Sequence, residues 1–160
     1  MKQKQWYTIG GNHIGISLKD AVKQALVAEQ MQGHNICLCI GTDSQVKGAV
    51  TVFATAIVFV RKQNGAFLFV NKELITQKYS IKQRMMQEVA RSIETAYDLK
   101  DTLREMNIEM EIHVDINSHK AFKSNEALQD AVGYITGMGF KYKIKPDAFA
   151  SSSCANKVVQ

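Results

Sequence analysis

Apolar residues follow strand-like patterns in the first half of the chain. Residues 35–40 ("NICLCI") form a short apolar run, and residues 50–60 ("VTVFATAIVFV") are rich in β-branched and aromatic side chains. Asn64 and Gly65, a dipeptide typical of tight hairpin turns, separate this second run from residues 66–74 ("AFLFVNKEL"). The pattern predicts an antiparallel meander whose first and third strands run in the same direction.

Helical spacing frames this meander on both sides. Residues 17–32 begin with a motif similar to a capping box and repeat apolar residues every three to four positions until Gly33. Residues 80–106 contain neither glycine nor proline and predict the longest helix.

The second half of the chain continues with alternating elements. Residues 108–116 ("IEMEIHVDI") alternate apolar and polar side chains, which predicts a fourth strand. A helix from about residue 124 to the glycines at 133–139, a fifth strand at 140–145 ("FKYKIK") and a closing helix from about residue 148 complete the order.

These elements predict one α/β domain over residues 1–160, in which residues 1–33 are an N-terminal extension and helix. The sheet is expected to be mixed and five-stranded, with helices flanking it. If the long helix is a crossover, the fourth strand lies parallel beside the first. An exposed edge of the second or third strand could then pair with another copy of the chain, as a homo-oligomer.

Composition narrows the class of protein. No apolar run has the length of a membrane span, and the N-terminal residues lack the apolar centre of a signal peptide, so we expect a cytoplasmic protein without a membrane partner. The chain has 20 Lys and Arg against 15 Asp and Glu, with a formal net charge of +5. This charge fits a polyanionic partner and fits an ordinary basic surface equally well.

The chain contains three cysteines. Cys37 and Cys39 are two residues apart on a predicted strand and so point to one face. No other Cys or His has the spacing that completes a zinc site, so buried free thiols are favoured over metal ligands.

Acidic residues stand in unusual places. Asp43 and Asp115 each follow the apolar part of a predicted strand, and parallel neighbours would bring them to the edge of the sheet where α/β proteins bind ligands. On the long helix, Glu88 falls within the apolar stripe, whereas Glu94 falls on the opposite side. A buried glutamate is costly unless it is paired, for example with an arginine, or bound to a metal ion.

Asp147 is a fourth acidic candidate, at the entrance to the closing helix, where it could also be an N-cap. Clustered carboxylates repel one another unless cations lie between them. An oxygen-rich site suits Mg²⁺ or Mn²⁺ better than Zn²⁺.

Four motifs carry a resemblance to a known family: "IGTDSQ" at 40–45, "MMQEVA" at 85–90, "HVDIN" at 113–117 and "KPDAFASSS" at 145–153. In this order they resemble the YkuK-like family of the ribonuclease H-like superfamily, over about residues 34–160. The resemblance implies a metal-dependent nuclease with two Mg²⁺ or Mn²⁺ ions, acting on phosphodiester bonds of RNA, DNA or a hybrid.

The same resemblance implies that Asp43, Glu88 and Asp115 are the first three catalytic metal ligands. It implies Asp147 as the fourth, or Asn156 in its place. A nucleic-acid-binding or protein-binding module that keeps the fold without efficient chemistry is the alternative function.

Several other polar residues are weaker candidates. His113 shares the strand parity of Asp115 and is interpreted as a packing residue, while His119 is either a proton carrier or an ordinary surface histidine. The basic residues that could contact phosphates are Lys47, Arg84, Lys120, Lys123, Lys141, Lys143 and Lys145.

Overall fold

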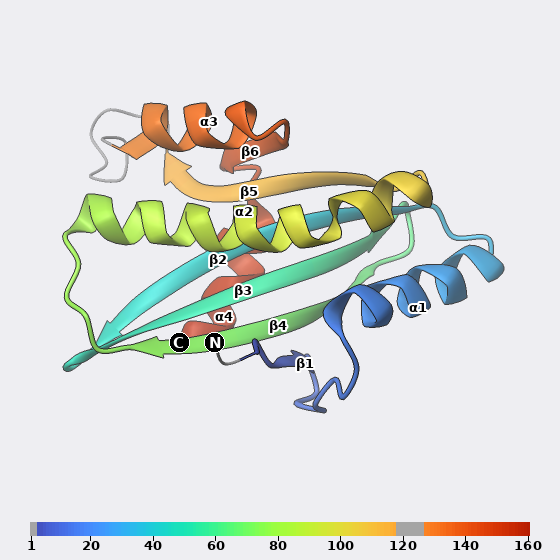
Figure 1. The fold of residues 1–160 in the computed structure, drawn as a ribbon, viewed down its shortest axis with the longest axis horizontal. Coiled ribbons are helices and arrows are strands. Elements are labelled where there is room, and N and C mark those ends of the chain that lie inside the picture. The colour runs from blue at the N-terminus through green and yellow to red at the C-terminus, as the bar shows by residue number, and fades with distance from the viewer. Residues whose placement is uncertain (1–2, 118–126) are drawn as a thin grey trace.

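The computed structural model describes residues 3–117 and 127–160, which form a mixed six-stranded sheet with helices on both faces (Figure 1). The strand order is β1-β4-β3-β2-β5-β6. In chain order the elements are β1 (Trp6–Thr8), α1 (Leu18–Met31), β2 (Ile36–Lys47), β3 (Val50–Arg61), β4 (Ala66–Ile75), α2 (Ile81–Glu105), β5 (Glu109–Asn117), α3 (Leu128–Gly137), β6 (Lys141–Lys145), the π-helix η2 (Ala150–Ala155) and α4 (Asn156–Val159).

The mixed α/β fold predicted from the sequence is confirmed. Strands β2, β3 and β4 form the antiparallel meander, and α2 crosses over to β5, which pairs parallel with β2. The number of strands differs, because the three residues of β1 pair antiparallel with β4 and are too short to give a periodic signal. Strand β3 is an interior strand between β2 and β4, and β1 already pairs part of the outer edge of β4.

Strand β2 is longer than the sequence suggests. We expected Asp43 to stand at its C-terminal end, but its pairing with β3 continues to Lys47. Its pairing with β5 stops earlier, at Gly41 and His113. We call the region beyond these two residues, where β2 and β5 are no longer paired, the β2–β5 fork. Asp43 therefore lies inside a strand, at this fork.

The main core lies between the sheet and the helices α1, α2 and α3, which cover one face (Figure 1). Its largest fully buried side chains include Leu26, Leu38, Ile40, Ile57, Phe59, Leu99, Leu103, Ile112, Ile116 and Ile135. Helix α2 begins with a complete capping box, in which Ser80 and Gln83 exchange side-chain and backbone hydrogen bonds.

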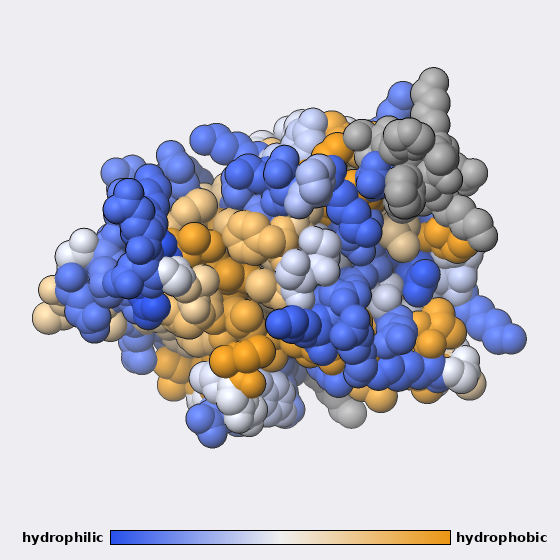
Figure 2. Space-filling view, turned by 180° about the vertical axis from the view of Figure 1, so that it is seen from behind, coloured by the Kyte–Doolittle hydropathy of each residue, from blue (hydrophilic) through white to orange (hydrophobic). Residues whose placement is uncertain are grey.

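The opposite face of the sheet is covered by η2 and α4 around a smaller cluster that contains Cys39, Ala56, Val58, Ala150 and Ala155. Seen from behind, this side of the molecule shows apolar side chains gathered in the middle of the view and bordered by hydrophilic ones (Figure 2). No helix among residues 3–117 and 127–160 is both long and apolar enough to span a membrane.

Candidate active site

Three carboxylates from three elements meet around the β2–β5 fork. Asp43 on β2 and Glu88 on α2 are only 6% and 4% exposed, and Asp115 on β5 is half-buried. Burial raises the pKa of Glu88 well above its usual value, and the charges of Asp43 and Asp115 raise it further. The three acids therefore share one electrostatic environment, although their oxygens do not all come within 4.8 Å of one another.

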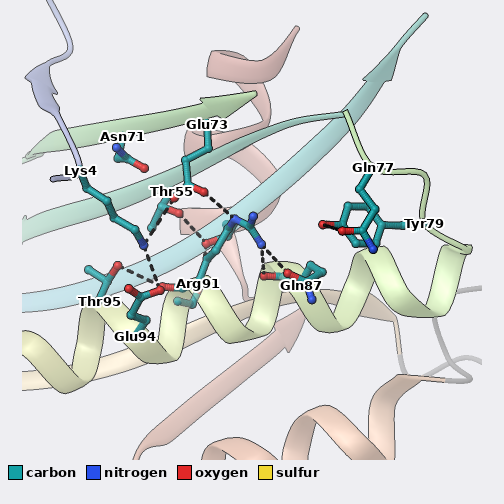
Figure 3. A network of polar contacts seen from close by, with 12 residues as sticks. Lys4, Thr55, Asn71, Glu73, Gln77, Tyr79, Gln87, Arg91, Glu94 and Thr95 are labelled. Atoms are coloured by element: carbon teal, nitrogen blue, oxygen red, sulfur yellow. Dashed lines mark hydrogen bonds and ion pairs between the residues drawn. The ribbon is translucent and has the colours of Figure 1, made fainter. Parts of the chain in front are cut away.

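Glu88 reaches the fork because polar contacts of Arg91 and Ser92, in the next turn of the helix, fix α2 against the sheet. Arg91 donates to the side chains of Glu73 (3.3 Å) and Gln87 (2.8 Å) (Figure 3). The guanidinium of Arg91 also lies over the ring of Phe53. One turn from Glu88, the buried Ser92 hydroxyl lies 2.8 Å from the Thr42 hydroxyl of β2. These contacts set the rotation of α2 about its axis.

The contacts of Glu88 itself are few. Ser44 on β2 donates its hydroxyl hydrogen to Glu88 Oε1 at 2.5 Å. Among the described residues Glu88 forms no ion pair, and the charge of Arg84 lowers its pKa only as the smallest of the contributions. The alternative of a glutamate neutralised by an arginine is therefore not observed.

Asp43 is held by an amide rather than by a cation. Asn156, at the start of α4, donates its side-chain N–H to Asp43 Oδ2 at 2.7 Å and accepts a hydrogen bond from Gln160. Burial raises the pKa of Asp43, the hydrogen bond from Asn156 lowers it, and the charge of Asp115 raises it. This balance leaves the pKa above its ordinary value.

Asp115 is close to a lysine but lacks a directed donor. Lys145 Nζ on β6 lies 2.8 Å from Asp115 Oδ1. The same oxygen is buried and has no hydrogen-bond partner among the described residues, so the contact is an ion pair without good hydrogen-bond geometry. A small pocket in the fork is lined by Thr42, Glu88, Val89, Ser92, His113, Val114 and Asp115.

The two candidates for the fourth position are placed differently. Asp147 is exposed, and no side-chain hydrogen bond or ion pair of Asp147 is observed within the described part of the chain. It is not an N-cap either, since η2 begins after Phe149 without a side-chain cap. The structure brings Asn156, and not Asp147, to Asp43.

His113 is buried next to the fork and contacts η2, in agreement with its interpretation as a packing residue. It is 1% exposed, and its Nδ1 accepts the backbone N–H of Ala150, so Nε2 carries the hydrogen donated to Glu111 at 2.9 Å. Burial lowers the pKa of His113, which is consistent with a neutral ring. By anchoring η2, His113 helps to place Asn156. His119, Lys120 and Lys123 lie outside the described residues.

Sequence reasoning missed one contact of the site. Ser44 was not singled out, although strand alternation contains the signal: Thr42 and Ser44 share the face of β2 that carries Leu38 and Ile40, which is the face covered by α2.

A mixed sheet with a crossover helix defines an α/β protein, and its acidic cluster lies where two parallel strands diverge, at the edge of the sheet where such folds commonly bind ligands. The chain matches the model of the family described as "Ribonuclease H-like" over residues 20–160 and belongs to this family. It is 33% identical over 134 residues to "Uncharacterized protein YkuK" of Bacillus subtilis (strain 168), an alignment that covers 75% of this chain and 77% of the relative. No solved structure matches the chain significantly.

Proposed function

We propose that this protein is a metal-dependent nuclease that hydrolyses phosphodiester bonds in RNA, DNA or a hybrid. One observation carries the proposal: Asp43, Glu88 and Asp115 come from separate elements to one fork. There burial, reinforced by the charges of the two aspartates, raises the pKa of the glutamate. Holding like charges together destabilises a protein unless a ligand of opposite charge binds to them.

The side chains at the fork fit Mg²⁺ or Mn²⁺. The donors are oxygen atoms, and Asp115 Oδ1 is a buried oxygen without a hydrogen-bond donor among the described residues. Asp43, Glu88 and Asp115 would hold two ions, with the side-chain oxygen of Asn156 as a neutral fourth ligand after rotation of its amide. When bound, such ions supply an activated water and positive charge for the phosphodiester transition state.

The other residues of the site prepare it for this role. Ser44 orients Glu88, and Asn156 and Lys145 partly offset the negative charge of the two aspartates. Lys145 is 40% exposed, so it can leave Asp115 and contact a phosphate oxygen of the substrate. The net charge of +5 favours association with a polyanion.

The test is cleavage of labelled RNA, DNA and hybrid oligonucleotides in Mg²⁺ or Mn²⁺, with EDTA as the metal-free condition. We expect cleavage that EDTA stops and that Glu88→Gln abolishes. Glu94→Gln is the matched control, because it makes the same change on the exposed side of α2. There Glu94 pairs with Lys4, its one ion-pair partner in the described part of the chain, so the variant should keep full activity.

A second function is favoured by a specific observation: two acids of the fork already have protein partners. Asn156 donates a hydrogen bond to Asp43, and Lys145 forms an ion pair with Asp115. A ribonuclease H-like module that binds nucleic acid or protein without efficient chemistry would show these contacts. The same assay separates the two. If no substrate is cut, while nucleic-acid binding is measurable and weakens as salt rises, the binding module is the correct function.

A further inference from the structure

A second cluster of metal-ligand side chains lies away from the fork, on the face of the sheet that carries η2. Cys37 and Cys39 on β2 and Glu111 on β5 place their sulfur and carboxylate atoms within 4.8 Å of one another. Cys39 and Glu111 are register partners on the paired parallel strands, with Sγ 3.6 Å from Oε1. Among residues 3–117 and 127–160, this is the one group of three such side chains that meets this distance.

This cluster is distinct from the acidic site. Cys39 precedes Asp43, and Glu111 precedes Asp115, by four residues on the same face of their strands. At roughly 3.3 Å per residue, the two sites are about 13 Å apart. None of the three residues takes part in the proposed phosphodiester chemistry.

The surroundings of the cluster suit a soft metal. Cys39 is buried against Ala56 and Val58, while Cys37 and Glu111 are half-buried, so the group is open to solvent on one side. It belongs to the face on which apolar side chains gather (Figure 2). Such surroundings exclude most water while leaving an entry path for an ion.

We propose that Cys37, Cys39 and Glu111 form a zinc site with water in the fourth position. In tetrahedral zinc sites the Zn–S and Zn–O distances are about 2.3 Å and about 2.1 Å, which places the donor atoms roughly 3.5–3.8 Å apart. The three donors reach this arrangement by small side-chain movements. Binding releases the two thiol protons to solvent and leaves both sulfurs as thiolates.

His113 and Lys143 complete the arrangement without being ligands. His113 Nε2–H donates to Glu111 Oε1 at 2.9 Å and fixes the carboxylate, as hydrogen-bonded partners of metal ligands commonly do. Lys143 Nζ lies 3.5 Å from the same oxygen and balances the negative charge of two thiolates and one carboxylate. Thiolate ligands also separate this site from the fork, since Mg²⁺ and Mn²⁺ prefer oxygen donors.

The experiment is a titration of the reduced, metal-free protein with Co²⁺, followed by displacement with Zn²⁺ in the presence of excess Mg²⁺. We expect thiolate-to-cobalt charge-transfer absorption that saturates at one equivalent and disappears when Zn²⁺ is added. Cys37→Ser and Glu111→Gln should each weaken zinc binding roughly 100-fold or more, as measured by competition with a chromophoric chelator.

Two variants serve as matched controls. Cys154→Ser changes the third cysteine, which packs on the same face but is outside the ligand group, and should bind zinc as the wild type does. Glu88→Gln changes the acidic site alone and should also leave zinc binding unchanged. Circular dichroism establishes that each variant is folded.

Three results would overturn the proposal: absence of the charge-transfer band in the reduced protein, an unchanged band in both Cys37→Ser and Glu111→Gln, or an equal loss in Cys154→Ser. If Cys37→Ser does not fold, Glu111→Gln decides together with alkylation of the wild type. Zn²⁺ should protect Cys37 from a thiol reagent, and unprotected alkylation would show that the cysteines are free thiols.

Discussion

At the scale of single residues, Glu88 can separate a functional role from a structural one. Its burial beside two aspartates raises its pKa, so the ionised form opposes folding near neutral pH. Glu88→Gln should therefore raise the melting temperature of the metal-free protein by a few degrees, because it removes the charge while Gln still accepts the hydrogen bond from Ser44.

Thermal melts of the wild type and of Glu88→Gln in EDTA and in Mg²⁺ test this prediction. Mg²⁺ should raise the melting temperature of the wild type and have much less effect on the variant. A variant that melts well below the metal-free wild type and still gains fully from Mg²⁺ would show that Glu88 is structural.

Asn156 and Asp147 provide a second comparison of residues. Asn156→Asp adds a carboxylate to the three already at the fork and places it beside Asp43. It should therefore lower metal-free stability and strengthen Mg²⁺ binding by about tenfold. Asp147→Asn changes an exposed residue and should alter neither by a measurable amount. Calorimetric Mg²⁺ titration of both variants is the measurement. A loss of Mg²⁺ affinity in Asp147→Asn would show that Asp147 is a metal ligand after all.

The sequence predicts some of these placements and not others, for physical reasons. Helical periodicity alone puts Glu88 on the sheet-facing side of α2, because a regular 25-residue helix keeps its phase. The choice between Asp147 and Asn156 depends on the chain between β6 and α4, which includes the six-residue π-helix η2. Such a helix changes the angle between successive side chains, and the sequence does not signal it.

At the scale of elements, Gly41 sets how closely η2 approaches the sheet. A Cβ atom on Gly41 would lie 2.4 Å from the backbone nitrogen of Ser151 and 2.6 Å from the carbonyl carbon of Ala150. Gly41→Ala should therefore displace η2 and lower the free energy of unfolding by about 3 kcal/mol. Urea denaturation measures the change.

The matched control for Gly41 is Gly133→Ala on α3, where an added Cβ meets no atom within 4 Å. The same substitution should stabilise the protein there by up to about 1 kcal/mol, because alanine favours helix. Equal effects at the two positions would contradict the role assigned to the close packing of η2.

An ion-pair cluster ties α1 to β3. Glu29 accepts two hydrogen bonds from Arg61, each 2.8 Å long, and lies 2.5 Å from His34 Nδ1. The hydrogen bond from Arg61, opposed by burial and assisted by His34, lowers the pKa of Glu29 to about 2. Because this folded-state pKa is below the unfolded value of 4.5, the stabilisation is present above pH 4.5 and is lost as the pH falls toward 2.

Glu29→Gln should accordingly lower the melting temperature at neutral pH and reduce its decrease on acidification below pH 4.5. Melts over this acidic range compare the two proteins. Parallel curves for wild type and variant would mean that Glu29 is not responsible for the acid sensitivity.

The elements themselves were predictable where they are long and periodic, as in α2 and β5, or long and rich in β-branched residues, as in β3. Strand β2 was cut short, because residues 41–45 ("GTDSQ") have the composition of a turn. Its continuation depends on pairing with β3, a tertiary contact that overrides local preference. Strand β1 was missed since three residues give no periodicity.

At the scale of the whole molecule, the two proposed sites lie along the same two strands, β2 and β5, and differ in the chemistry of their ligand atoms. The fork offers carboxylates between α2 and α4, and the cysteine cluster offers sulfur on the η2 side of the earlier part of β2. Both use β2 and β5, so their stability depends on the same pairing of strands. Metal binding at either site should therefore appear in the global unfolding of the domain.

We expect the acidic fork to give the whole protein a characteristic response to pH and Mg²⁺. The pKa values of Asp43 and Glu88 are raised above their ordinary values of 3.8 and 4.5, so the folded metal-free protein binds more protons than the unfolded chain between those values and the raised ones. Acidification from neutral pH toward 4.5 therefore relieves repulsion at the fork and stabilises the fold there. If the fork is a metal site, Mg²⁺ competes with these protons, so its stabilising effect should be large at neutral pH and vanish as the pH falls. Melting temperatures with Mg²⁺ and with EDTA, measured from about pH 8 to about pH 5, give this difference directly. The contributions of Glu29 and His113 are present under both conditions and cancel. A difference that does not change with pH, or that is equally large in Glu88→Gln, would show that Mg²⁺ binds elsewhere and that the fork is not a metal site.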